Sequence, residues 1–159
     1  MKFEKHFPND TLKPYIKYYV VSEMDKETEY KVFPISGLVI GFQYKGQLTA
    51  IKDNETDKLK SAGVSGLSDS YRLFKNSADI GSVLVYFTET GFSHFASHPV
   101  HELFNLSISL DTIFNKNQIH EVEEKLAGSK TDNQRIRIIE QFLCSQLKSI
   151  ETDRLVTEA

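Results

Sequence analysis

Hydrophobic and polar residues alternate in short runs through the first half of the chain, which predicts β-strands rather than helices. The run at 82–88 is apolar on both faces, so we expect a central strand covered on both sides. Short strands at this spacing are typical of an antiparallel barrel or sandwich. The predicted strands are residues 15–22, 37–44, 47–51, 61–67, 71–75 and 82–88.

The sequence also predicts the structure of two connections between these runs. Lys45 and Gly46 separate the second run from the third, and Gly accepts the positive φ that tight turns need. The pattern therefore predicts a hairpin between residues 38–44 and 47–51. Residues 53–60 are almost entirely polar and are interpreted as a solvated loop.

After residue 90 the apolar period becomes helical. Residues 117–128 place Ile119, Val122 and Leu126 on one face and stop at Gly128, a natural residue just past a helix end. A second helix is predicted over 131–150.

The second helix opens with Thr131, followed three positions later by Gln134, which is the pattern of a capping box. Its apolar residues recur every three or four positions and form a stripe over four turns. The stripe consists of Ile136, Ile139, Leu143, Leu147 and Ile150, widened by Phe142.

These elements predict an α+β fold: a small antiparallel β-barrel or cupin-like module followed by a short C-terminal helical tail. We assign residues 1–90 to the β-rich barrel module and residues 91–159 to a helical extension. The extension is expected to pack on the barrel, so that both form one structural domain. A chain of 159 residues is long enough for such a core.

The composition of the chain excludes some classes of function but says little more about the fold. The net charge of −3 argues that this chain alone does not grip DNA or an anionic membrane, which requires clustered Lys and Arg. Cys144 is the single cysteine, so no internal disulfide can form and a cytoplasmic location is expected. No run approaches the roughly 20 apolar residues of a membrane-spanning helix.

Three histidines in residues 84–105 raise the question of a metal site. His94, His98 and His101 would share a face of one continuous helix, but Pro99 disfavours helical angles at His98 and breaks that face. Cupin metalloenzymes carry a His-x-His pair, which this sequence lacks. We therefore expect no metal and no cofactor, and interpret the stretch as a phenylalanine-rich structural joint.

The chain also lacks the motifs of common catalytic sites. There is no P-loop and no G-x-G-x-x-G, and the segment "GVSGL" does not have the spacing of a nucleophile elbow. Cys144 lies beside an apolar stripe without a C-x-x-C partner, where thiols are more often inert than nucleophilic. We predict no catalytic residue and no enzymatic activity.

Several segments together resemble the N-terminal domain of AraC-type transcriptional regulators. "LKPYIKYYVVSE" is similar to the family's opening strand, with Tyr19 where Trp is usual, and "FPISGLVIGF" to its next segment, with Ser36 in place of an acidic residue. The stretch from Gly81 resembles the family signature, except that Glu89 stands where the family has Pro. The signature positions filled are Val85, Phe87, Gly91, Phe95, Pro99, Glu102, Leu103, Asn105 and Leu110.

The resemblance implies a regulatory domain of a bacterial transcription factor that senses a ligand, dimerises, or does both. It implies a small-molecule effector, a homodimer, and DNA binding through a C-terminal helix-turn-helix region that this chain does not include. We therefore expect the chain to be the sensor half of a longer regulator. The alternatives are a stand-alone small-molecule-binding module and, less favoured, a cupin-like metalloenzyme.

Two sets of residues are predicted to carry these roles. An effector inside the barrel would contact alternating strand residues, although the inward face of strand 82–88 is ambiguous. Dimerisation is assigned to the second helix, whose stripe could equally dock on its own barrel. The predicted ligand-binding residues are Val39, Phe42, Tyr71, Val85 and Phe87, and the predicted dimerisation residues are Ile136, Ile139, Leu143 and Leu147.

Overall fold

The computed structural model describes residues 1–34, 36–66, 68–97, 99–104 and 107–158, with residues 148–158 as backbone only. The strands are β1 (Lys2–His6), β2 (Ile16–Met24), β3 (Thr28–Val32), β4 (Val39–Lys45), β5 (Leu48–Lys52), β6 (Glu55–Lys58), β7 (Ala62–Ser65), β8 (Arg72–Asn76), β9 (Ile80–Phe87) and β10 (Ser107–Ser109). Short 3-10 helices cover Gly91–His94, Val100–Leu103 and Leu110–Thr112, and the α-helices are α1 (Lys116–Ala127) and α2 (Asp132–Glu158).

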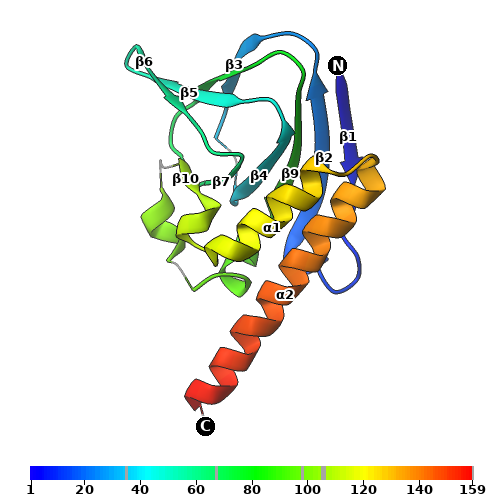
Figure 1. The fold of residues 1–159 in the computed structure, drawn as a ribbon. Helices are drawn as coiled ribbons and strands as arrows, with labels where there is room; N and C mark the ends of the chain where they lie inside the picture. Colours follow the sequence, from blue (N-terminus) through cyan, green and yellow to red (C-terminus); the bar gives the residue numbers. More distant parts are fainter. Residues whose placement is uncertain (35, 67, 98, 105–106, 159) are drawn as a thin grey trace.

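The described strands form two antiparallel sheets. The larger has the order β1-β2-β9-β4-β7-β10, and the smaller has the order β3-β8-β5-β6. Helices α1 and α2 lie together on one side of the larger sheet (Figure 1). The predicted α+β, cupin-like fold is confirmed, with one refinement: the two sheets form an open sandwich and not a closed barrel.

Strand β9 is central, as its apolar character on both faces predicts. It pairs with β2 on one side and with β4 on the other. Val83, Val85 and Phe87 point into the hydrophobic core that the sheet shares with the helices. The intervening Ser82, Leu84 and Tyr86 line the space between the two sheets. Alternate residues of one strand therefore serve two different interiors.

The predicted hairpin at Gly46 is wrong, although the turn itself is present. Gly46 has a φ of +83°, as the turn prediction requires. However, β4 pairs with β7 and β9, whereas β5 pairs with β6 and β8. The chain thus crosses from the larger sheet to the smaller at this point. A turn residue specifies a change of direction and does not specify which strands pair afterwards.

The interpretation of residues 53–60 as a solvated loop is also wrong. β6 lies within this segment and pairs with β5, from Lys52 opposite Glu55 to Thr49 opposite Lys58. Asp53 and Asn54 form the turn with φ values of 53° and 63°, the left-handed geometry that two-residue hairpins favour. The Asp53-Asn54 pair was the sequence signal for this hairpin turn. The polar side chains hid the strand because β6 is exposed along its whole length.

The two α-helices follow their predicted patterns closely. The capping box forms: the Gln134 amide donates to Thr131 Oγ1 over 3.2 Å, and the Thr131 amide donates to Gln134 Oε1 over 3.3 Å. Gly128 ends α1 with a φ of −88°, which is right-handed and not the left-handed cap common at this position. No helix of the described residues is long and apolar enough to cross a membrane.

The strands and helices share one core. β10 comes from the predicted helical extension, yet it pairs with β7 at the edge of the larger sheet. Buried residues of α1 and α2 belong to the same hydrophobic cluster as those of β2, β4 and β9. The division of the chain at residue 90 stays a prediction.

Candidate functional site

A cavity of about 440 Å³ lies between the two sheets and is open to solvent. Its floor is the face of the larger sheet that points away from the helices, and its roof is the smaller sheet. Aromatic and aliphatic side chains line it together with several hydroxyl groups. The apolar lining includes Met24, Tyr30, Val32, Phe33, Val39, Leu48, Val64, Phe74, Ile80, Leu84, Tyr86 and Ile108, and the polar lining includes Ser22, Gln43, Ser65, Arg72, Asn76, Ser82, Ser107 and Ser109.

Two glycines lie side by side on the floor. Gly41 of β4 is opposite Gly63 of β7 in the register, and both line the cavity. A neighbouring row across the floor is polar, with Ser82 of β9 opposite both Ser22 of β2 and Gln43 of β4. The floor therefore combines positions without side chains with a band of hydrogen-bonding groups.

The roof is built mainly on β8. Arg72, Phe74 and Asn76 are two residues apart and all three line the cavity, as the alternation of a strand requires. Arg72 Nη1 donates a hydrogen bond of 2.7 Å to Ser107 Oγ of β10, which joins the two sheets across the cavity. Phe74 is buried and contacts Tyr30 ring to ring.

Two polar groups on this roof lack partners within the described part of the chain. Arg72 Nη2 is buried and makes no hydrogen bond, and the same holds for Asn76 Oδ1. Asn76 is 2% exposed, and its amide nitrogen is already committed to the carbonyls of Lys26 and Ser77. Unpaired buried polar groups are rare and costly in native proteins. Both of these atoms belong to residues that line the cavity.

The predicted ligand-binding residues are divided between three locations. Val39 lines the cavity. Phe42, Val85 and Phe87 are buried on the opposite face of the larger sheet, in the core shared with the helices. Tyr71 is 50% exposed beside Phe33, with 6.5 Å between the ring centroids. Binding by all five residues stays a prediction. For Phe42, Val85 and Phe87, it is the adjacent residues Gly41, Leu84 and Tyr86 that face the cavity.

Sequence reasoning did not identify Arg72 or Asn76. Both occur in the predicted strand 71–75 or next to it, and the available signal was their period of two with Phe74. Arg72, Phe74 and Asn76 lie on one face of the strand. A strand face with two polar residues out of three normally indicates exposure to solvent, so the pattern gave no reason to expect Arg72 and Asn76 inside.

The predicted dimerisation residues lie in the core of the monomer. Ile139 and Leu143 are 0% exposed, and Ile136 and Leu147 are 8% exposed. These four side chains pack against the sheet and α1 within the same chain. Their role in a dimer stays a prediction, although this packing already covers them.

The phenylalanine-rich stretch is a joint between sheet and helices. Phe92 and Phe95 are buried and meet Phe87 edge to face, with ring centroids 5.5 Å and 5.6 Å apart. Gly91 is needed for close approach, because a Cβ there would collide with the carbonyl oxygen of Tyr15.

Only two of the three histidines of this stretch lie within the described residues. The His94 ring contacts the Tyr15 ring at a tilt, with 4.7 Å between the ring centroids, and His101 is exposed. His98 lies outside the described residues, as does Asn105 of the signature.

A different group, Glu4, His6 and Asp132, has ligand atoms within 4.8 Å of one another. Asp132 is already paired through one oxygen with Lys2 at 2.6 Å and through the other with Arg135 at 2.8 Å. An ion would have to compete with both cations, so this geometry does not favour a metal.

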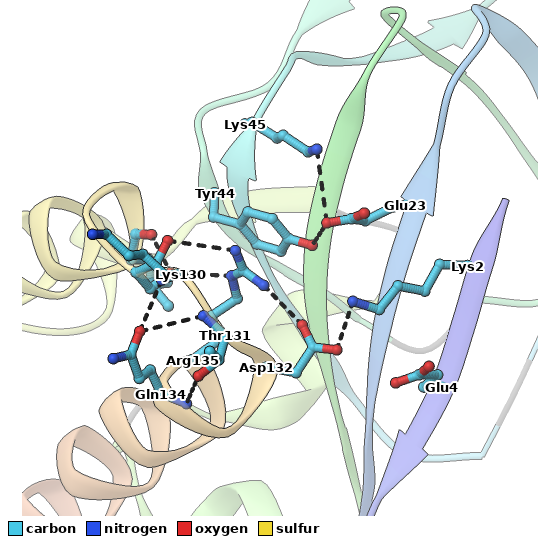
Figure 2. A network of polar contacts seen from close by, with 12 residues as sticks. Lys2, Glu4, Glu23, Tyr44, Lys45, Lys130, Thr131, Asp132, Gln134 and Arg135 are labelled. Carbon is cyan, nitrogen blue, oxygen red and sulfur yellow. Dashed lines mark hydrogen bonds and ion pairs between the residues drawn. The ribbon is translucent and has the colours of Figure 1, made fainter.

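A polar network attaches the start of α2 to the larger sheet (Figure 2). The Arg135 guanidinium carbon lies over the Tyr44 ring, 4.0 Å from its centroid, and the Tyr44 hydroxyl donates to Glu23 over 2.6 Å. The hydrogen bond from Tyr44 lowers the pKa of Glu23, and burial raises the pKa of Tyr44. With the Asp132–Lys2 pair, these contacts join α2 to β4, β2 and β1.

Comparisons with known proteins agree with this architecture. A family model described as "Domain of unknown function (DUF6597)" matches residues 4–109. No curated protein matches the sequence. Among solved structures, apo ToxT from Vibrio cholerae has a TM-score of 0.51 at 12% identity, over 93% of this chain and 58% of that chain.

Two further structures have lower TM-scores. ToxT from Vibrio cholerae O395 has a TM-score of 0.47 at 15% identity, over 82% of this chain and 54% of that chain. The EutQ protein of Clostridium difficile has a TM-score of 0.37 at 12% identity, over 55% of this chain and 67% of that chain. The chain thus spans little more than half of the ToxT chains. The similarity to apo ToxT confirms the resemblance to the AraC-type regulatory domain at the level of the fold.

Proposed function

We propose that this chain, which belongs to the DUF6597 family, is the effector-binding regulatory domain of an AraC-type transcription factor. The observation that carries the proposal is the cavity between the two sheets, in a chain with the fold seen in ToxT. Its volume of about 440 Å³ falls in the usual range of small-molecule sites. A mostly apolar wall with a few polar groups suits a small, partly apolar effector.

The larger sheet offers a route from the cavity to α2. Leu84 faces the cavity, whereas its neighbour Val85 packs in the core under the helices. Figure 1 shows α2 crossing this face and extending past the sandwich. A ligand that prefers one position of these strands would shift the population of helix positions, which is the requirement for regulation.

The other parts of the proposal concern the whole protein. We infer that it acts in the cytoplasm as a homodimer, has no enzymatic activity, and binds DNA through a separate domain. The net charge of −3 on this chain supports the last point, because DNA binding requires clustered basic residues.

Binding of the neutral, fluorescent probe N-phenylnaphthylamine tests the cavity. We expect saturable binding with enhanced emission, and its loss in Leu84→Trp, because the larger ring fills space on the cavity floor. Glu55→Trp is the matched control, since Glu55 is exposed on β6 and does not line the cavity. Equal binding by Leu84→Trp and the parent would contradict a site between the sheets.

A second measurement tests regulation separately from binding. Hydrogen exchange of the α2 amides should change when the cavity is saturated with the probe. If the probe binds and exchange in α2 is unaltered, the chain is a binding module without regulatory output.

A further inference from the structure

The charge of the cavity lining differs from that of the whole chain. The protein has a net charge of −3, yet among the described residues that line the cavity there is no Asp or Glu. The two ionisable lining residues of definite charge are Lys60 and Arg72. Lys60 is exposed and paired with Asp111 at 3.2 Å, so Arg72 supplies the positive charge inside.

One hydrogen bond orients the Arg72 guanidinium, and one of its terminal nitrogens has no partner. Nη1 is held by Ser107 Oγ at 2.7 Å, while Nη2 is buried without a hydrogen-bond partner in the described structure. Burial lowers the pKa of Arg72, but an arginine stays protonated in proteins. A charged and partly unsatisfied guanidinium is a good site for a carboxylate, which accepts hydrogen bonds of matching geometry.

Asn76 provides the complementary group further along the same strand. Its Oδ1 is buried and unpartnered, so it can accept a hydrogen bond from a ligand donor. Phe74 lies between the two on the same face. Arg72 and Asn76 are four residues apart, so their Cα atoms are separated by about 13 Å. A ligand that meets both groups is therefore elongated, with an apolar middle.

We propose that the cavity selects organic carboxylates, with the carboxylate on Arg72, the apolar body along Phe74 and a donor group directed to Asn76. The proposal rests on the proposed function, because it names the class of effector for the same cavity. It adds what shape and volume alone do not give, which is the sign of charge that the ligand carries.

The test compares three probes of one shape: phenylbutyrate, its neutral alcohol phenylbutanol, and hydroxyphenylbutyrate with the hydroxyl at the far end of the ring. Each is titrated against bound N-phenylnaphthylamine. We expect phenylbutyrate to bind about ten- to a hundredfold more tightly than phenylbutanol, the range for a hydrogen bond to a charged group. Hydroxyphenylbutyrate should bind more tightly still, by severalfold, because its hydroxyl donates to Asn76.

Variants assign the effect to Arg72. Arg72→Met should reduce phenylbutyrate affinity to about that of phenylbutanol, while phenylbutanol and N-phenylnaphthylamine still bind, which also shows that the variant is folded. Lys75→Met is the matched control: it removes one positive charge from the exposed face of the same strand and does not line the cavity. It should alter none of the affinities. Arg72→Lys should retain part of the preference for the carboxylate.

The outcomes separate the two proposals. Equal binding of phenylbutyrate and phenylbutanol to the parent chain overturns the carboxylate inference and leaves the cavity as a neutral site. A preference that survives in Arg72→Met also overturns it. If hydroxyphenylbutyrate binds no better than phenylbutyrate, the assigned contact with Asn76 is wrong. Absence of binding by N-phenylnaphthylamine itself contradicts the proposed function.

Discussion

The Tyr19 hydroxyl of β2 donates a hydrogen bond of 2.9 Å to Glu140 Oε2 of α2. The same oxygen accepts from the backbone amide of Asn9 over 3.0 Å. Tyr19 is 0% exposed, and its burial, reinforced by Glu140, raises its pKa, so the phenol remains a donor. One carboxylate thus joins a central strand, the N-terminal loop and the helix that we propose carries the regulatory output.

Removing this hydroxyl should loosen the helix from the sheet. We expect Tyr19→Phe to lower the free energy of unfolding by about 1–2 kcal/mol, because Glu140 keeps only its bond from Asn9. Tyr18→Phe is the control, since the Tyr18 ring stacks on Tyr86 and no hydrogen bond from its hydroxyl occurs among the described residues. Urea denaturation measures both. A cost for Tyr18→Phe equal to that for Tyr19→Phe would argue against a specific contribution from the bond.

Leu143 separates a core role of α2 from a dimer role. Because its side chain is 0% exposed, Leu143→Ala should cost about 2–5 kcal/mol of unfolding free energy at every protein concentration. Gln141→Ala, on the exposed side of the same helix, should change it by no more than about 0.5 kcal/mol. A Leu143→Asp chain that stays folded but sediments as a smaller species than the parent would place Leu143 at a dimer contact instead.

Two glycines should respond oppositely to replacement by alanine. Gly46 has a φ of +83°, and a Cβ there would lie 2.7 Å from Ile80 Cα, so we expect Gly46→Ala to cost about 2 kcal/mol or more. Gly128 has a φ of −88°, and the nearest atoms to its Cβ would be 3.8 Å away. Gly128→Ala should therefore be stabilising by about 0.4–1 kcal/mol. Thermal unfolding checks the pair, and destabilisation by Gly128→Ala would show that its cap needs glycine.

The ion pairs of Asp132 predict a loss of stability in acid. Burial alone would raise the pKa of Asp132, but hydrogen bonds from Lys2 and Arg135 outweigh it and lower the pKa. A carboxyl whose folded pKa is lowered stabilises the fold above its unfolded pKa, about 3.9, and loses that contribution as pH falls through the folded value.

Asp132→Asn should therefore be less stable than the parent at pH 7 and lose less stability below about pH 4. Asp10→Asn provides the comparison, because the Asp10 side chain is 96% exposed in its pair with Lys13. Urea denaturation across the acid range measures the three chains. Parallel pH profiles for Asp132→Asn and the parent would show that this carboxylate contributes nothing.

Local patterns in the sequence determined where most elements lie. The apolar alternation located β2, β4, β5, β7, β8 and β9, and the Thr131–Gln134 pair marked the start of α2. These features depend on neighbouring residues, so the chain itself carries the information. The resemblance to AraC-type regulators, based on motif order, also gave the correct fold. β1, β3 and β10 were not predicted, and β6 was misread because its side chains are exposed.

Tertiary packing decided which strand faces became buried and what each face contacts. The sequence showed that β9 is apolar on both faces, but only the packing placed Val85 under the helices and Leu84 in the cavity. Likewise, the Gly46 turn was visible, whereas the assignment of β4 and β5 to different sheets depends on pairing with distant strands. The contact between Arg72 and Ser107 spans 35 positions. Such contacts are decided by how two sheets stack, because a period of two defines the faces of a strand without saying what each face will meet.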